Sequence, residues 1–272
     1  QDQNRNLFVV DYVLPIGKGG QFEAGYRGDF SKQTTDVSVF NNGVLNLNFT
    51  NLLEYKEKVN AFYTQYGFKV KKFSFLFGMR WEDSDIDVNQ YTTNDINNKR
   101  YNNFFPSAFF TYEVSDKSSV SVSYSKRIQR PRGRQLNPFS NYSSNINIFQ
   151  GNPDIDPSMT DAIDFGYLKR WDKLTLSTSL YVNRTTDVFQ FVRRESGDFV
   201  NGIPVIISSP INLATDYRIG FEFTLNYSPY KWWKLNSNFN FFYNETDGEF
   251  SYTDINDNLV IQDFDFSATS WF

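Results

Sequence analysis

Residues 214–243, which read ATDYRIGFEFTLNYSPYKWWKLNSNFNFFY, decide the fold class. Every second residue from Ile219 to Tyr227 is apolar, and the residues between them are polar, charged or glycine. After a short Ser-Pro-Tyr-Lys segment, nearly the same alternation returns from Trp233 to Tyr243. Alternation over this length predicts strands with one apolar and one polar face, and helical spacing does not fit it. The stretch therefore predicts two antiparallel strands joined by a tight turn.

The same period-two pattern recurs along the 272 residues and predicts eleven strands. In chain order they cover residues 7–16, 21–31, 55–68, 73–83, 104–114, 118–128, 160–170, 173–192, 214–227, 232–245 and 264–272. In 58–66 and 104–112, apolar residues occur on both faces, so the pattern leaves the register of these two stretches open.

The connections between the predicted strands alternate between short and long without exception. The short ones are 17–20, 69–72, 115–117, 171–172 and 228–231, and the long ones are 32–54, 84–103, 129–159, 193–213 and 246–263. Outer-membrane barrels of Gram-negative bacteria have tight turns at the periplasmic end and long loops outside. The sequence therefore predicts an all-β fold, an antiparallel transmembrane β-barrel segment with short periplasmic turns and long extracellular loops.

Composition supports lipid-facing strands and narrows the function. Aromatic residues make up 19% of the chain although the mean hydropathy is −0.52, which suits strands with one lipid-facing and one polar face. Aromatic residues crowd the strand ends beside the short turns, as in an interfacial girdle: Phe68, Phe73, Trp171, Tyr230, Trp232 and Trp233. Without His or Cys, hydrolase triads, zinc sites and disulfides lose their usual participants. We expect no catalytic residue, no metal site and no cofactor, and the mixed charges give no sign of a nucleic-acid partner.

Strand direction leads to a further expectation. If the short turns are periplasmic, the first predicted strand runs from the outside inward, whereas an exported barrel normally begins from the periplasm. Eleven strands also cannot close a single-chain bacterial barrel, which uses an even number. We therefore expect residues 1–272 to be a partial outer-membrane β-barrel domain, whose plug and remaining strands lie outside this chain.

One long connection carries a family resemblance. Residues 123–167 read SYSKRIQRPRGRQLNPFSNYSSNINIFQGNPDIDPSMTDAIDFGY. Arg127, Arg130 and Pro131 are followed by Leu-Asn-Pro-Phe at 136–139 and by Gly-Asn-Pro at 151–153 with Pro157. This combination resembles the outer-membrane β-barrel family of TonB-dependent-receptor-like proteins of the Bacteroidetes type. Ile155 stands where that family usually has Leu, and 132–134 are more basic than its pattern. Weaker similarity extends to 19–28 and 214–243, so nearly the whole chain is covered.

The resemblance implies a barrel of about twenty-two strands, an N-terminal plug and import powered by the TonB complex. It implies a multi-pass protein of the cell outer membrane that contacts the lipid bilayer and lipopolysaccharide, with a surface lipoprotein as a possible partner. The imported nutrient stays open, since sugars, peptides, siderophores and cobalamin all use this architecture in the wider class. Because no residue is expected to do covalent chemistry, we expect the protein not to be an enzyme.

The loop of the resemblance holds the first candidate site. Its candidate ligand residues are Arg127, Arg130, Arg132, Arg134, Asn152 and Asp154. Guanidinium groups could attract an anionic ligand or lipopolysaccharide phosphates. Alternatively, they pair with Asp154, Asp156 or Asp161 and hold the loop, which is the interpretation that surface Arg clusters favour.

A second set of charges occurs within the predicted strands and is expected to face the lumen. Its members are Glu23, Arg27, Arg80, Arg218 and Glu222. Charge is tolerated on the lumen face and costs about 2–4 kcal/mol for Arg or Lys on the lipid face at the midplane. These residues line a solute path, or they brace the wall and contact a plug, and we favour bracing. The acidic spacings at 83–87 and 254–257 lack the Gly and bidentate Glu of a calcium loop, so solvated loops are predicted there.

Three functions remain open from the sequence. The first is a nutrient-importing receptor, the second a plugless porin or structural barrel, and the third a soluble β-sandwich adhesin. A plug domain in the complete reading frame distinguishes the first from the second. Extraction only by detergent distinguishes either from the third.

Overall fold

The computed structural model describes residues 2–45, 50–92, 94–138, 146–254 and 256–271, so Phe139 and Phe272 lie outside the described residues. Its long strands are β1 Asp2–Ile16, β2 Gly20–Val37, β5 Asn51–Val70, β6 Phe73–Gln90, β7 Asp95–Ser115, β8 Ser118–Gln129, β10 Ser158–Arg170, β11 Leu174–Val200, β12 Ile203–Tyr230, β13 Trp233–Asp247 and β16 Phe266–Trp271. The short elements are β3 Phe40–Asn41, β4 Val44–Leu45, α1 Gly133–Leu136, β9 Asn147–Phe149, β14 Glu249–Thr253 and β15 Leu259–Asp263. No helix in the described ranges is long and apolar enough to cross a bilayer.

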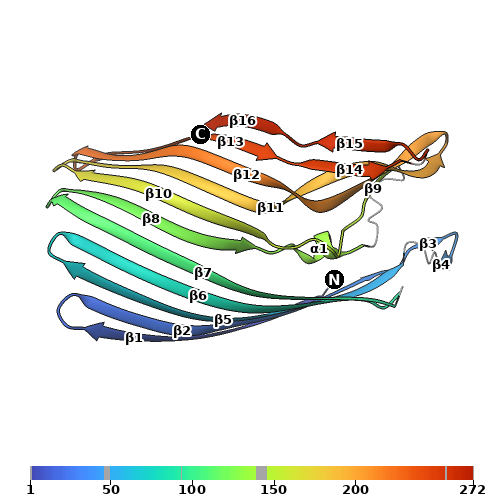
Figure 1. The fold of residues 1–272 in the computed structure, drawn as a ribbon, viewed down its shortest axis with the longest axis horizontal. Helices are drawn as coiled ribbons and strands as arrows, with labels where there is room; N and C mark the ends of the chain where they lie inside the picture. Colours follow the sequence, from blue (N-terminus) through green and yellow to red (C-terminus); the bar gives the residue numbers. More distant parts are fainter. Residues whose placement is uncertain (1, 46–49, 93, 139–145, 255, 272) are drawn as a thin grey trace.

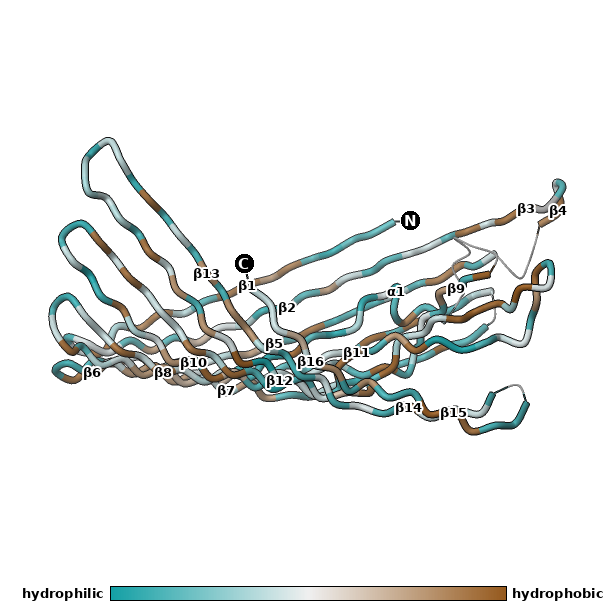
Figure 2. The backbone as a smooth tube through the Cα atoms, turned by 90° about the horizontal axis from the view of Figure 1, so that it is seen from above, coloured by the Kyte–Doolittle hydropathy of each residue, from teal (hydrophilic) through white to brown (hydrophobic). Residues whose placement is uncertain are grey.

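The eleven long strands form one antiparallel meander in which each strand pairs with its neighbour along the chain (Figure 1). Each predicted strand corresponds to one of them, so the predicted all-β barrel segment is confirmed. Strand β9 adds to β12 in parallel, whereas β3 with β4 and β14 with β15 form two small separate hairpins. The sheet curves into an open trough, with β1 and β13 rising at its two sides (Figure 2). Such curvature follows from strand twist, as in a barrel wall.

The pairing register sorts the side chains onto two faces, because directly opposed residues share a face. One row across the sheet is polar or small in nearly every strand: Val13, Glu23, Gln65, Gly78, Ser107, Ser125, Ala162, Asn183, Arg218 and Asn244. The adjacent row is apolar or aromatic throughout: Leu14, Phe22, Tyr66, Phe77, Ala108, Tyr124, Ile163, Val182, Ile219 and Tyr243. The first row lies on what we call the inner face and the second on the outer face.

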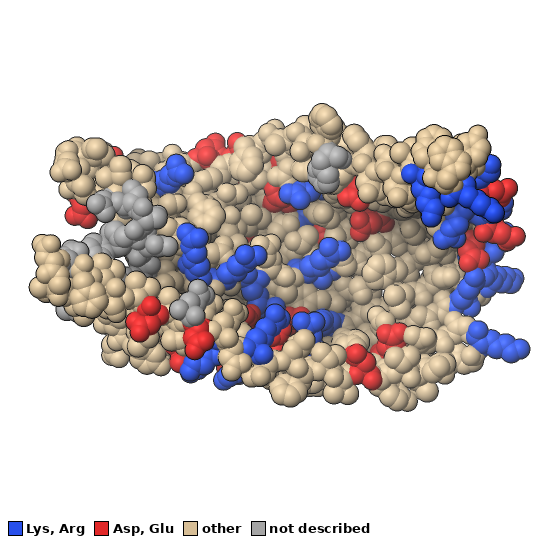
Figure 3. All heavy atoms as spheres, turned by 180° about the vertical axis from the view of Figure 1, so that it is seen from behind, with Lys and Arg blue, Asp and Glu red and all other residues tan. Residues whose placement is uncertain are grey.

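The outer face is left uncovered by protein. Phe77 is 51% exposed and Ile219 is 48% exposed, values that a second protein layer would not leave on such large apolar side chains. The inner face is hollowed, and basic and acidic side chains gather over its middle (Figure 3). An apolar convex face opposite a charged concave face is the arrangement of a membrane barrel wall.

The short connections lie together at one end of the sheet, as predicted (Figure 1). At the other end, two segments predicted to be loops, 84–103 and 193–213, instead continue the strand ladder. Strands β11 and β12 are joined by a two-residue turn in which Asn201 and Gly202 both have positive φ, of 50° and 78°, as a type I′ turn requires. On β6 the prediction ended the strand too early because the outer face of that strand becomes polar. Asp83, Asp85 and Asp87 continue the alternation without apolar partners.

A matched pair of substitutions on β8 tests the assignment of faces. Val122 lies on the outer face between Phe110 and Phe165, whereas Ser123 lies on the inner face beside Asp164. In lipid vesicles, we expect Val122→Arg to lower the unfolding free energy of the complete protein by about 2–4 kcal/mol. Ser123→Arg should have little effect, since Asp164 can pair with the new guanidinium group. Urea unfolding of both variants measures the difference, and equal losses would contradict the assignment.

Candidate functional site

The connection after β8, described at 130–138 and 146–157, does not extend away from the sheet but folds onto its inner face. We call these residues the docked loop. Leu136 in α1 and Ile155 in the following turn are each only 1% exposed. They pack against four inner-face side chains of β5 and β6, which are Leu53, Tyr55, Ile86 and Val88. This small apolar core forms because the inner face is polar at the level of the lipid-facing band and becomes apolar beyond it. This core fixes the loop on the inner face, at the end of the sheet opposite the short turns.

The Gly-Asn-Pro motif at 151–153 has a packing reason. The Gly151 amide donates to the Asn137 carbonyl at 2.8 Å, and the Asn152 amide donates to the Gln135 carbonyl at 2.6 Å. A Cβ on Gly151 would clash with the Asn137 carbonyl oxygen and would lie 2.7 Å from that of Gln135, so only glycine fits. The Asn152 side chain accepts from the Asp154 amide at 2.9 Å and donates to the Pro210 carbonyl at 3.2 Å. Asn152 therefore ties the loop to β12.

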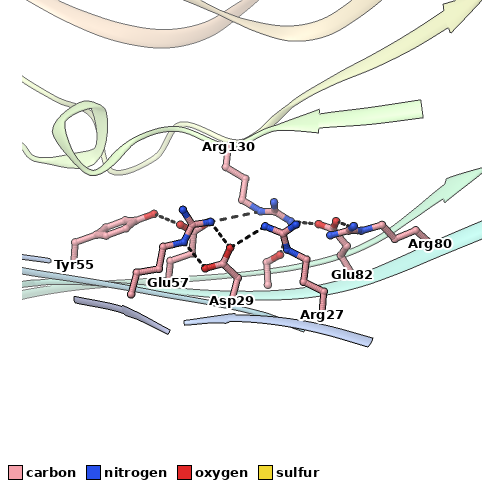
Figure 4. Close-up of polar contacts among 9 residues, drawn as sticks. Arg27, Asp29, Tyr55, Glu57, Arg80, Glu82 and Arg130 are labelled. Carbon is pink, nitrogen blue, oxygen red and sulfur yellow. Dashed lines mark hydrogen bonds and ion pairs between the residues drawn. The ribbon is translucent and has the colours of Figure 1, made fainter. Parts of the chain in front are cut away.

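Arg130 enters the trough at the start of this loop and meets acidic residues of the inner face (Figure 4). Its Nη2 forms an ion pair with Glu82 and donates to the Ser84 hydroxyl at 2.7 Å, and its Nε lies 3.8 Å from Glu57 Oε1. The Glu82 side chain is 6% exposed and also accepts from Arg80 Nε at 2.5 Å. These contacts join the loop to β6 through charge-assisted hydrogen bonds and to β5 through an ion pair.

A second ion pair lies beside the first on the same face. Arg5 grips the Asp29 carboxylate with two donors, at 2.7 and 2.5 Å, and Arg27 Nη2 lies 3.5 Å from the same carboxylate. The two groups enclose a hollow of about 350 Å³, whose charged lining residues are Arg5, Arg27, Arg80, Arg130, Asp29 and Glu57. We call this hollow the arginine pocket. The guanidinium side chains of Arg27 and Arg80 are 41% and 37% exposed and present donors to the lumen.

Two carboxylates near this level have shifted pKa values. The apolar outer residues end at Phe62 on β5 and Trp81 on β6, so Glu54 and Glu57 lie beyond the lipid-facing band. Lys32 and Lys56 hold the pKa of Glu54 at about 2 through their hydrogen bonds. Burial raises the pKa of Glu57, and the charge of Arg130 opposes that rise. The proximity of Arg130 therefore helps Glu57 to remain ionised inside the trough.

The basic run does not form one cluster. Only Arg130 points into the arginine pocket, whereas Arg127, Arg132 and Arg134 are exposed. Arg132 precedes α1 and its amide donates to Gln135 Oε1 at 2.9 Å, while the Arg134 guanidinium lies 4.6 Å from the centre of the Phe149 ring.

The acidic partners considered for this run were also the wrong ones. Arg130 pairs with Glu82, while Asp156 pairs with Lys99 at 3.0 Å and Asp161 accepts from the Tyr124 hydroxyl at 2.6 Å. Asp154 is exposed on its turn.

The five residues expected to face the lumen share the inner face but not one site. Arg27 and Arg80 line the arginine pocket, and Glu23 nearby accepts from Gln21 and Gln65, each at 2.5 Å. On the other side of the sheet, Arg218 donates to Asn244 at 3.0 Å and lies 5.0 Å from the centre of the Phe242 ring. Glu222 pairs in register with Ser179 and Asn240 and is exposed.

Sequence reasoning missed three charged residues of the pocket, which are Arg5, Asp29 and Glu57. It also missed Glu82, which pairs with Arg80 and Arg130 beside the pocket. Asp29 and Glu82 follow Arg27 and Arg80 by two positions, so the alternation itself could have placed them on the inner face. Arg5 preceded the first predicted strand, and Glu57 preceded the stretch of open register. The contact of Arg130 with Glu82 spans 48 positions and left no signal in the local pattern.

All 272 residues match the model of a family described as the outer membrane protein beta-barrel family. The chain belongs to this family. Its location in the outer membrane as a multi-pass β-barrel follows. The predicted outer-membrane β-barrel family is confirmed, whereas the likeness to TonB-dependent receptors and the Bacteroidetes type remain predictions. No curated protein matches the chain by sequence.

Solved structures share the fold at low sequence identity. The copper transporter OprC has a TM-score of 0.64 and 13% identity over 90% of this chain and 37% of its own. The ferric-catecholate import receptor Fiu from K12 E. coli has a TM-score of 0.59 and 12% identity over 91% and 43%. The ferric yersiniabactin uptake receptor FyuA from Yersinia pestis has a TM-score of 0.59 and 9% identity over 99% and 46%. This chain thus spans less than half the length of each. Within the residues that the structure describes, no group of three or more His, Cys, Asp or Glu side chains could hold a metal ion.

Substituting Arg130 by Met tests whether the ion pair holds the loop. Glu82 keeps Arg80 as a partner, so we expect a loss near the lower limit for a buried charge pair, about 2 kcal/mol. Trypsin should then cut after Arg132 or Arg134 roughly 30-fold faster in the folded protein. Arg127→Met is the matched control, because that arginine is exposed. Equal cleavage of R130M and wild type would show that the pair does not hold the loop.

Substituting Gly151 by Ala tests the packing of the motif. The added methyl group forces Asn137 and Gln135 apart, which we expect to destabilise the docked loop by about 1–3 kcal/mol. Hydrogen–deuterium exchange should rise in the peptide covering 146–157 while the ladder stays protected. Gly19→Ala is the control, since its Cβ would meet nothing closer than 3.6 Å. Unchanged exchange in G151A would refute the explanation given for this glycine.

Proposed function

We propose that this chain forms part of the barrel wall of a TonB-dependent receptor that imports a nutrient across the outer membrane. The observation that carries the proposal is the arginine pocket, in which Arg27 and Arg80 present guanidinium donors to the lumen just inside the docked loop. A passive wall needs only polar residues on this face. Arginines held in place by Asp29 and Glu82 are suited to contact a solute or a plug.

The larger barrel is supported by the sheet edges and by the length of the similar proteins. Strands β1 and β16 each pair on one side only within the described residues. An open strand edge in hydrocarbon leaves backbone donors and acceptors unsatisfied, so a wall of this kind continues on both sides until it closes. The chain covers about two fifths of the solved import proteins that it resembles. A closed barrel of about twenty-two strands is therefore part of the proposal.

The proposed mechanism is binding and passage without covalent chemistry. Extracellular loops and a plug bind the nutrient, the TonB complex moves the plug, and the nutrient passes along the inner face. Four guanidinium groups outnumber the carboxylates of the pocket, which favours a nutrient or plug segment that carries negative charge. The three solved proteins compared above are a copper transporter, a ferric-catecholate import receptor and a ferric yersiniabactin uptake receptor, which supports an import role without fixing the nutrient.

A plugless porin is the second candidate, since the inner face is mostly polar at the level of the lipid-facing band. Its lumen would conduct passively, and the arginine pocket would only brace the docked loop. The similarity of the fold to that of uptake receptors favours the first candidate. Lipopolysaccharide and a surface lipoprotein remain proposed partners on the extracellular side.

Electrical recording distinguishes the two candidates without knowledge of the nutrient. The complete protein, purified from outer membranes and inserted into planar bilayers, should show no steady conductance, because a plug closes the lumen. The immobilised protein should also retain the purified periplasmic domain of TonB. A steady open-channel current together with no retention of TonB would exclude the receptor and support the porin.

A further inference from the structure

The end of the sheet that carries the short turns is strongly basic. Positions 17–19, 69–72, 113–118, 169–173 and 228–234 hold ten of the chain's 27 basic residues but only three of its 31 acidic residues. The net charge of this end is therefore positive although that of the whole chain is −4. Basic side chains crowd this end in the space-filling view, at the right of Figure 3.

Two neighbouring turns combine this charge with aromatic rings. The turn from β10 to β11 and the turn from β12 to β13 are joined by a hydrogen bond from the Ser228 amide to the Lys173 carbonyl, at 2.8 Å. Lys169 Nζ lies 5.8 Å from the centre of the Trp171 ring, and Lys173 Nζ lies 5.8 Å from that of Tyr230. Tyr230 stacks on Trp232 with ring centres 5.7 Å apart, and Trp232 stacks on Trp233 at 6.4 Å. We call these two lysines and four aromatic residues the basic-aromatic patch.

The patch lies at the edge of the lipid-facing band. Lys169 is directly opposed to Leu176, which is opposed to Leu225, so its side chain belongs to the outer face. Tyr230 is opposed to Trp233 two positions before Leu235 of the same face. Trp232 is 82% exposed. A large aromatic ring that is this exposed favours an environment that is partly apolar and partly polar. Trp and Tyr rings take up this position at the level of lipid headgroups.

The two lysines are available for a ligand. The one acidic residue in their turn, Asp172, pairs with Lys117 at 2.5 Å. Within the described part of the chain, neither Lys169 nor Lys173 makes an ion pair with an acidic side chain. Each therefore keeps its ammonium group next to an aromatic ring and free to meet an anion at the membrane surface.

We propose that the basic-aromatic patch binds the headgroup of an anionic phospholipid in the periplasmic leaflet. The lysines bind the phosphate, while the rings of Trp171 and Trp232 lie along the glycerol and upper acyl region. A phospholipid is the occupant because the short-turn end faces the periplasm, whereas lipopolysaccharide lies at the other surface. The inference depends on the outer-membrane location of the family and does not require the proposed import function.

Competition between two lipids tests this inference. The complete protein, purified in detergent and freed of lipid, is mixed with equal amounts of dioleoyl phosphatidylglycerol and dioleoyl phosphatidylcholine. Native mass spectrometry then counts the lipid molecules retained. Wild type should retain the anionic lipid preferentially. In K169Q/K173Q this preference should fall about 25-fold, since each lysine contributes about fivefold.

Two further variants serve as controls. K58Q/K126Q removes the same charge from the outer face at the opposite end of the sheet, on β5 and β8, and should keep the preference. K169R/K173R retains the charge and should keep it as well, and a heat-modifiable gel shift verifies that every variant is folded. An unchanged lipid ratio in K169Q/K173Q, or an equal fall in K58Q/K126Q, would overturn the proposal.

Discussion

The structure depends on one constraint, which is that a chain crossing hydrocarbon must pair all its backbone donors and acceptors with other parts of the protein. The meander meets this constraint by joining each strand to the next with an antiparallel ladder, from β1 to β16. Since side chains alternate across a strand, the ladder fixes one face toward lipid and one toward the lumen together. Rows such as that of Phe77 and that of Gly78 are therefore set by the same register, and neither face can change without the other.

Where the strands leave the membrane, the constraint on the outer face ends while the ladder continues. On β6 the outer residues change from Trp81 to Asp83, whereas the inner residues become more apolar, at Ile86 and Val88. Water can solvate both faces at this level, so an apolar inner face is exposed unless something covers it. The docked loop supplies Leu136 and Ile155 as that cover, and Arg130 completes it with a charge for Glu82. The arginine pocket thus exists because the wall extends beyond the bilayer.

The alternation of apolar and polar residues predicted the strands and the face on which each residue lies. Contacts between residues far apart in the chain were missed. All eleven strands were predictable, because residues such as Phe73, Phe75 and Phe77 repeat a pattern that only a half-exposed strand explains. The extension of β6 was missed since an outer face of Asp residues has the composition of a solvated loop. Arg130 was a candidate from its motif, but its partners Glu82 and Glu57 lie on strands that the loop reaches only after folding. Periodicity assigns a residue to a face, and it cannot say which distant residue will meet it there.

Charged side chains have different roles in the arginine pocket and at the periplasmic turns. In and beside the arginine pocket, guanidinium groups form ion pairs with Asp29, Glu57 and Glu82, so most of their charge is used within the fold. At the periplasmic turns, the ammonium groups of Lys169 and Lys173 face aromatic rings, which attract a cation without neutralising it. Residual positive charge is therefore concentrated where phosphate headgroups surround the wall. A barrel wall needs anchoring residues at both membrane surfaces, because the hydrocarbon core alone does not set how deep the sheet lies in the bilayer.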